Sequence, residues 1–284
     1  MVTILEPNLP PLLKETPQPP HLLYVKGNAA CLTNPSVAIV GTRAITPYGE
    51  KTCAYITAAC VRAGLTIVSG LATGVDAVAH QTTLELGGTT IAVLGSGLDP
   101  TVLFPAGHRS LAQRIIKQNG ALVSEYPATT LARRHYFLAR NRILAGLSLA
   151  TIVIEASYQS GAINTAHHAI EANRLVYAVP GSIFSPRSAG THRLLQAGAS
   201  ILYRLEDLFA ELKLSAPTTL GHSKIKLPPL QQQLVQCLQS TSLTSEQLAE
   251  FTGYSCDLVQ AALTELEIQG IVRKNIWMLY ELIT

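Results

Sequence analysis

The segment "RRHYFLARNR", residues 133–142, concentrates residue types that bind nucleic acid. It holds four arginines, with Tyr136 and Phe137 between them, in a chain of which only 14% of the residues are charged. Guanidinium groups neutralise phosphates, and an exposed aromatic ring stacks on an unpaired base, which is worth about 1–3 kcal/mol per base. Because the bases of a duplex are already stacked, this combination favours a single strand. The alternative, in which the rings are in the core and the arginines form a solvated face, stays open.

Three glycine-bearing turns follow short apolar runs and could bind phosphate. They are "VGTRAITPYG" (40–49), "SGLATGVDAVAH" (69–80) and "LGSGLD" (94–99). Glycine lets the backbone approach a phosphate closely, and a helix that starts after the turn directs free N–H groups toward it. Arg43 lies in the first turn, where its guanidinium could reach the same anion. The turns lack the G-x-G-x-x-G and G-x-x-x-x-G-K-[ST] spacings, so turns that any parallel α/β fold requires are the alternative.

Residues that could act in catalysis or bind a metal are sparse. Asp76 and His80 lie four residues apart on one expected helix face and form a possible acid–base pair, although the helix dipole alone favours an aspartate in a first turn. His167 and His168 are adjacent in an expected helix and point in different directions, which disfavours a metal site. The five cysteines include no C-x-x-C pair, so neither a zinc site nor a disulfide framework is indicated. We therefore predict no metal and no cofactor.

The elements that would position these residues alternate regularly. Short β-branched runs are separated by stretches with apolar positions three and four apart, such as 49–64, 136–148 and 161–174. Continuous apolar strands between helices predict an α/β fold, a Rossmann-like, doubly wound and mostly parallel sheet that is covered on both faces. In such a sheet, ligands bind outside the carboxyl ends of the strands. The predicted strands read "VAIVG", "TIVSG", "TIAVLG", "ALVSE", "ATIVIEA", "LVYAVPG" and "ASILYRL".

The chain divides into modules of opposite charge. We predict an N-terminal extension (1–35), a Rossmann-like domain (36–212), a linker (213–227) and a C-terminal domain (228–284) whose three short helices and hairpin indicate a winged helix. The Rossmann-like domain has 14 Lys and Arg against 10 Asp and Glu, and the winged helix has 2 against 6. The expected recognition helix, 255–269, contains no Lys or Arg. Because reading of the major groove relies on basic and amide groups, this module is expected to contact protein rather than DNA.

The composition fits a globular protein of the cytoplasm. Apolar residues make up 48% of the 284 residues, which is enough for a packed core. There is no run of about 18 uncharged apolar residues, and residues 1–20 have no basic start, which argues against a membrane span and a signal peptide. The scattered cysteines fit a reducing compartment. We expect a soluble, cytoplasmic protein with no membrane partner.

A series of motifs follows in one register: "PPHLLYVKGN", "VAIVGTRAITPYG", "TIVSGLATGVDAVAHQTTLELGGTTIAVLGSGLD", "LVSEYP", "FLARNRILAGLS", "TIVIEASYQSGAINTAHHA", "VYAVPG" and "GTHRLLQAGA". In order and spacing they resemble the DNA-processing protein A family (DprA, also called Smf), over residues 20–212. The resemblance implies a domain that binds single-stranded DNA cooperatively as a homodimer, protects incoming DNA during natural transformation and helps to load the RecA recombinase. The family is not known for catalysis, so no enzymatic activity is expected.

The resemblance also implies which residues contact DNA. Arg134 stands where relatives place a basic phosphate contact, and Phe137 stands where they place a base-stacking ring. Thr73 stands where many relatives have arginine, which removes one possible phosphate contact. The other implied DNA-binding residues lie in two glycine turns, in the R-N-R motif and in a later loop: Gly41, Thr42, Arg43, Ser69, Gly70, Gly74, Arg140, Asn141, Arg142, Ser160, Gly161 and Thr165.

A nucleotide-processing enzyme is the main alternative. A related Rossmann-like group that hydrolyses nucleoside monophosphates carries a P-G-G-x-G-T-x-x-E motif. Here "PGSIFSPRSAGTHRLL" keeps PG and GT far apart, and no glutamate stands three residues after Thr191. The missing carboxylate leaves that activity without its expected catalytic group. A third alternative, a transcription regulator that acts through the winged helix, is disfavoured by the acidic recognition helix.

Overall fold

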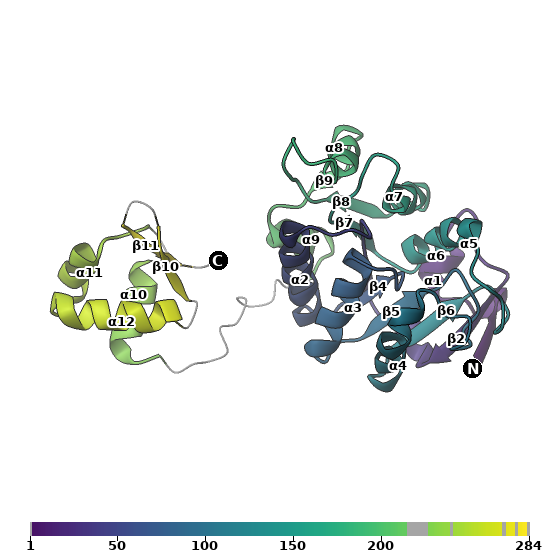
Figure 1. Ribbon diagram of the computed structural model, residues 1–284, viewed down its shortest axis with the longest axis horizontal. Coiled ribbons are helices and arrows are strands. Elements are labelled where there is room, and N and C mark those ends of the chain that lie inside the picture. Colours follow the sequence, from purple (N-terminus) through teal and green to yellow (C-terminus); the bar gives the residue numbers. More distant parts are fainter. Residues whose placement is uncertain (1, 215–226, 239–240, 269–270, 276–277, 283–284) are drawn as a thin grey trace. The chain divides into compact units, whose positions relative to one another are not determined.

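The chain forms two compact units, residues 1–217 and 218–284. Figure 1 shows both units in a computed structural model, which describes residues 2–214, 227–238, 241–268, 271–275 and 278–282. The predicted linker (213–227) lies mostly outside the described residues. The predicted domain boundaries stay predictions.

The larger unit is built on one sheet. Its strands are β1 (Val2–Leu5), β2 (Leu22–Gly27), β3 (Ser36–Val40), β4 (Thr66–Ser69), β5 (Thr90–Val93), β6 (Ala121–Ser124), β7 (Ala150–Val153), β8 (Leu175–Ala178) and β9 (Ser200–Ile201). Among the described residues these nine strands have the order β1-β2-β6-β5-β4-β3-β7-β8-β9. The strands from β6 to β9 are parallel, whereas β2 is antiparallel to β6 and β1 is antiparallel to β2. The strand order reverses between β3 and β7, which confirms the predicted doubly wound, mostly parallel sheet.

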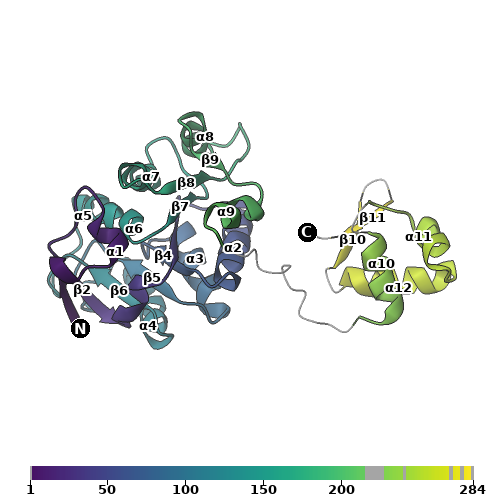
Figure 2. The same ribbon diagram turned by 180° about the vertical axis from the view of Figure 1, so that it is seen from behind.

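Helices cover both faces of this sheet (Figures 1 and 2). They are α1 (Pro11–Lys14), α2 (Pro47–Arg62), α3 (Val75–Glu85), α4 (Arg109–Lys117), α5 (Arg134–Ala139), α6 (Asn141–Gly146), α7 (Gly161–Glu171), α8 (Ala189–Gln196) and α9 (Leu205–Glu211), with 3₁₀ turns η1 (Glu6–Asn8), η2 (Ala29–Thr33) and η3 (Ala106–His108). Helix α3 packs against both α2 and α4 on one face. Helices α1, α6, α7 and α8 pack on the other face.

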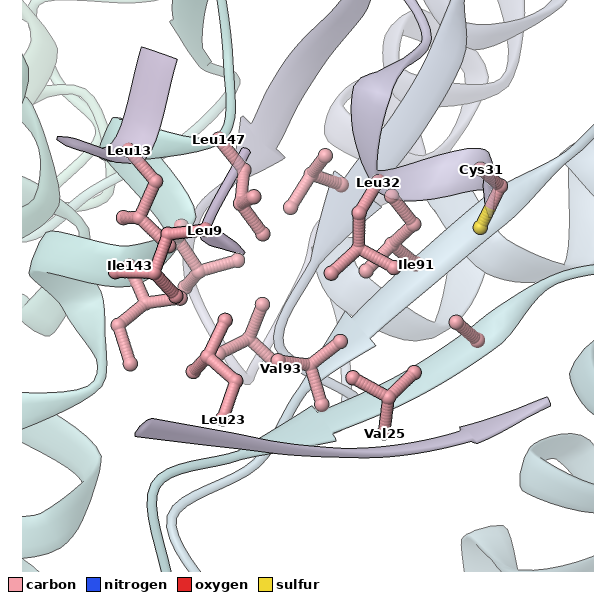
Figure 3. Packing of buried hydrophobic residues seen from close by; sticks show 14 residues of the cluster. Leu9, Leu13, Leu23, Val25, Cys31, Leu32, Ile91, Val93, Ile143 and Leu147 are labelled. Atoms are coloured by element: carbon pink, nitrogen blue, oxygen red, sulfur yellow. The ribbon is translucent and has the colours of Figure 1, made fainter. Parts of the chain in front are cut away.

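The hydrophobic core follows the two-residue period of the strands. Ile91 and Val93 of β5 join a cluster with Leu13 of α1 and Ile143 of α6, which Figure 3 shows at close range. Ala92, between them in sequence, joins the opposite cluster with side chains of α3 and α4. Burial on both faces explains why these strands read as continuous apolar runs.

The first 35 residues contribute to this sheet, although sequence reasoning set them apart as an extension. Strand β2 pairs with β6, with Tyr24 opposite Ser124, and β1 pairs with β2. Leu9 and Leu13 are buried in the cluster beneath α6. The predicted helix over 136–148 is two shorter helices, α5 and α6, which meet at Arg140.

The smaller unit has the predicted winged-helix composition. Its elements are α10 (Pro229–Cys237), α11 (Ser245–Thr252), α12 (Cys256–Ile268), β10 (Val272–Lys274) and β11 (Tyr280–Leu282). Thr244 and Gln247 form a capping box at the start of α11, which satisfies two free N–H groups of its first turn. Residues of α10, α11, α12 and the hairpin share one apolar core. No helix within the described part of the chain is long and apolar enough to cross a membrane.

Candidate functional site

A groove of about 900 Å³ lies at the carboxyl ends of β3, β4 and β7. The loops that follow these strands line it, and the α5–α6 segment closes one side. Among its described lining residues, three arginines and one aspartate carry charge, so the groove is basic. Of the predicted DNA-binding residues, those in the lining are Gly41, Thr42, Arg43, Arg134, Phe137, Arg140, Asn141, Ser160, Gly161 and Thr165. Ser69, Gly70, Gly74 and Arg142 lie outside it, although Gly70 lines a smaller adjoining hollow.

Backbone hydrogen bonds hold two glycine turns together next to Arg43. The Thr42 N–H donates to the Glu155 carbonyl at 2.7 Å, and the Val75 N–H donates to the Thr42 carbonyl at 3.1 Å. Gly74 has φ 75°, and a Cβ atom there would overlap the carbonyl oxygen of Thr42, so this position requires glycine. The packing of one turn on the other fixes the backbone from which the exposed Arg43 extends.

Arg140, at the centre of the predicted segment, is turned into the fold. Only 6% of the residue is exposed, and Nη1 donates to the carbonyls of Gly70 and Val93. Nη2 lies 3.8 Å from the Asp76 carboxylate. Burial lowers the pKa of Arg140 to about 10 and Asp76 opposes that shift, so the guanidinium stays charged at neutral pH. Arg140 therefore ties together the carboxyl ends of β4 and β5, and its predicted contact with DNA stays a prediction.

The second glycine turn is shaped around this arginine. A Cβ atom on Gly70 would overlap the Arg140 guanidinium. The Ser69 side chain is fully buried, and its hydroxyl donates to the Ile39 carbonyl at 2.7 Å. The DNA contacts of Ser69 and Gly70 stay predictions. In this structure the Ser69 hydroxyl joins the end of β4 to β3, and Gly70 leaves room for the Arg140 guanidinium.

The other members of the R-N-R motif also hold neighbouring segments. Asn141 donates to the Gly161 carbonyl at 3.2 Å and to the Asn164 side chain at 3.0 Å, which fastens α6 to the start of α7. Arg142 forms an ion pair with Glu125, and both side chains are more than four-fifths buried. The motif thus connects the α5–α6 segment to the walls of the groove.

Exposed cationic and aromatic side chains of the groove lie around Phe137. This half-buried ring has the guanidinium carbons of Arg43 and Arg140 at 5.5 and 5.8 Å from its centroid. The ring of Phe104, which is 49% exposed, lies 5.6 Å away and also lines the groove. Sequence reasoning missed Phe104, although "LFPAGH" places an aromatic residue in a loop after β5. Arg134 is exposed on the same rim.

Tyr136 belongs to a different cluster. Its ring stacks on Tyr126, with centroids 3.9 Å apart, and the guanidinium carbon of Arg133 lies 5.9 Å from it. Neither Tyr136 nor Arg133 lines the groove. The two adjacent aromatic residues therefore have separate surroundings, and Phe137 is the one that faces the groove.

The opposite wall is the start of α7. The Ser160 side chain caps this helix by accepting from the Ala162 N–H at 3.3 Å, and the buried Thr165 hydroxyl donates to the Gly161 carbonyl at 3.4 Å. Gly161 is exposed, with open space where a Cβ atom would stand. Of these three residues, Gly161 is the one whose surface is most open to a ligand.

Asp76 and His80 do not form an acid–base pair. His80 is fully buried, and its Nδ1 lies 2.7 Å from the Thr90 hydroxyl, which itself donates to the Ile67 carbonyl. His80 is therefore the donor in that contact, and burial lowers its pKa to about 3. Asp76 instead faces Arg140 and accepts from the Ala72 N–H at 3.2 Å. No cluster of His, Cys, Asp and Glu that could hold a metal occurs within the described ranges.

The chain matches one family over most of its length. A sequence profile described as "DNA recombination-mediator protein A" matches residues 1–213, and a second, "DprA winged helix domain", matches residues 216–274. The Smf protein of Synechocystis sp. is 34% identical, over 97% of this chain and 78% of the relative.

Two solved structures are similar to this chain over about three quarters of its length. The X-ray structure of DNA processing protein A from Streptococcus pneumoniae has 38% sequence identity and a TM-score of 0.69, covering 74% of each chain. The DNA processing protein A of Helicobacter pylori, a structure described for its single-stranded DNA binding mode, has 31% identity and a TM-score of 0.67, covering 75% of this chain and 95% of that one.

Proposed function

This chain belongs to the DNA recombination-mediator protein A family, and from that premise we propose that it is a single-stranded DNA-binding mediator of recombination. In this proposal it protects incoming DNA during natural transformation and loads the RecA recombinase onto it. It acts as a homodimer and catalyses no reaction.

One observation carries the proposal: the exposed Arg43 guanidinium lies 5.5 Å from the Phe137 ring in one basic groove. An unpaired strand offers each nucleotide as a phosphate and a free base face, so a cation beside a ring matches one nucleotide. Arg134 adds a second exposed cation on the rim. A duplex, whose bases are stacked on one another, would leave the Phe137 ring without a partner.

The same groove argues against nucleotide hydrolysis. Among its described lining residues the carboxylate is that of Asp76, which is buried against Arg140. Leu194, where the hydrolase motif has its glutamate, is buried. The hydrolase motif supplies a glutamate as its acid or base, and neither residue offers an accessible carboxylate in its place.

The roles of RecA and of the homodimer rest on family membership. For the winged helix we propose a protein contact, because α12 exposes Asp257, Glu265 and Glu267 and acidic side chains repel the phosphates of a duplex. Sedimentation of the full chain tests the homodimer, and the rate of RecA filament formation on a coated single strand tests loading.

Fluorescence anisotropy with labelled oligo-dT and with a duplex of equal length tests the proposed function. We expect tight binding of oligo-dT, weak binding of the duplex, and an affinity that falls steeply as salt rises. Equal affinity for oligo-dT and for the duplex would contradict the proposal. Release of free base from nucleoside monophosphates would favour the hydrolase instead.

A further inference from the structure

An aromatic residue and an arginine form a second pair at the far wall of the groove. Tyr158, in the loop between β7 and α7, is 59% exposed. The guanidinium carbon of Arg193, on α8, lies 4.6 Å from the centroid of its ring. Arg193 therefore lies closer to its ring than Arg43 lies to the Phe137 ring. Neither Tyr158 nor Arg193 was predicted to bind DNA.

The pair arises from the close docking of α8 on the loop that carries Tyr158. The Gly190 N–H donates to the Ala156 carbonyl at 2.8 Å, and the Ala156 N–H donates to the Arg187 carbonyl at 2.7 Å. A Cβ atom on Gly190 would stand 2.6 Å from the Ser157 carbonyl oxygen, so glycine permits this approach. Arg193 follows Gly190 by three residues and therefore lies on the same helix face. The backbone thus places Arg193 against Tyr158.

Tyr158 also connects this pair to the groove. Its side chain lines the groove together with Phe137 and Arg43, whereas Arg193 lies outside the lining. No carboxylate within the described ranges lies within 4.0 Å of Arg193, and the residue is exposed. Its charge is therefore available to an anion that passes over the edge of the groove.

We propose that the single strand leaves the groove on the side of β7 and β8 and continues over Tyr158, which stacks a base, and Arg193, which holds the adjoining phosphate. This inference rests on the proposed function and extends it, because it makes the binding site longer than the groove. Tyr158 and Arg193 repeat the ring and cation of Phe137 and Arg43. The strand then binds at two sites on opposite walls. The inner site is the pair Phe137 and Arg43, and the outer site is the pair Tyr158 and Arg193.

A length series of oligo-dT tests the outer site. Affinities are measured by anisotropy for strands from about 4 to about 20 nucleotides, with the full chain and with Tyr158→Ala and Arg193→Ala. We expect each variant to lose about five-fold or more on long strands and less than about two-fold on the shortest, so that the gain with length shrinks. Tyr158→Phe, which keeps the ring, should behave as the unaltered protein.

The same series includes matched control variants and a measurement of folding. Tyr55→Ala and Arg62→Ala remove the same residue types from exposed positions on α2 and should leave the length dependence unchanged. Circular dichroism should give each variant the spectrum and Tm of the unaltered protein. Variants at Tyr158 and Arg193 that bind long strands normally, or that lose the same factor at every length, would overturn the outer site. Failure of the unaltered protein to prefer oligo-dT over duplex would instead overturn the proposed function.

Discussion

Replacement of Arg140 by methionine separates a role in the fold from a role in DNA binding. Methionine keeps much of the length of the side chain but removes the donors to the Gly70 and Val93 carbonyls. It also leaves the Asp76 carboxylate buried without its cation. Removal of one partner of a buried pair costs about 3–5 kcal/mol. For a unit of this size, we expect Tm to fall by about 6–20 °C.

The loss of stability should depend on pH, with a sign set by Asp76. Burial raises the pKa of this carboxyl, and Arg140 is the largest of the influences that oppose the rise, so the substitution should move the pKa further up. A carboxyl whose pKa is higher in the folded state than in the unfolded state, where it is about 3.9, binds more protons when folded. Stability then falls as pH rises from that value through the folded pKa. The Tm difference between Arg140→Met and the unaltered protein should therefore be smaller at about pH 4.5 than at about pH 7.5.

Thermal melts followed by circular dichroism, together with oligo-dT binding measured well below Tm, check this prediction. Addition of Asp76→Asn to Arg140→Met removes the unpaired charge and should restore part of the lost stability. Arg62→Met, at an exposed position on α2, is the control for loss of an arginine. An Arg140→Met variant that has the Tm of the unaltered protein but no longer binds oligo-dT would refute a structural role for Arg140.

Three further substitutions and one truncation test separate parts of the groove and chain. Phe104→Ala should weaken oligo-dT binding by about 1–3 kcal/mol with little change in Tm. Tyr136→Ala should mainly lower Tm because its ring stacks on Tyr126. A Phe104→Ala variant that mainly lowers Tm, or a Tyr136→Ala variant that mainly weakens binding, would contradict these roles. Thr73→Arg adds a cation to an exposed position beside the groove and should steepen the slope of log affinity against log salt by about 0.7, so an unchanged slope would exclude a phosphate contact there. Removal of residues 215–284 should leave oligo-dT affinity unchanged, and a large loss would assign DNA contacts to the winged helix.

The central parallel strands, β3 to β7, were predictable because each is buried on both faces. All five residues of β3 are buried, and burial of that kind leaves a continuous apolar run in the sequence. The pairing of β2 with β6 was not predictable in the same way. Its partner lies about 100 residues further along the chain, with Tyr24 opposite Ser124, and β2 alternates buried with half-buried residues. Nothing local distinguishes such a strand from an independent extension.

The location of the groove was predictable, whereas the burial of Arg140 was not. Glycine turns at strand ends indicate where a ligand binds in a parallel sheet, and Arg43 and Phe137 do line one groove. Arg140 carries the same residue type as Arg43, yet it is buried because the Gly70 and Val93 carbonyls meet at its position. Those acceptors are 70 and 47 residues away in the chain. Only the folded structure separates an arginine that supports the groove from one that faces it.

The role of the groove as a single-strand site is tested most directly by the oligo-dT affinity of an Arg43→Ala, Phe137→Ala double variant, measured by anisotropy over a salt series. Loss of the ring should cost about 1–3 kcal/mol per stacked base, and loss of the cation should lower the salt slope by about 0.7. A double variant that is correctly folded by circular dichroism should therefore bind oligo-dT weakly and with a shallower slope. Unaltered affinity and slope in that folded variant would contradict single-strand binding in this groove.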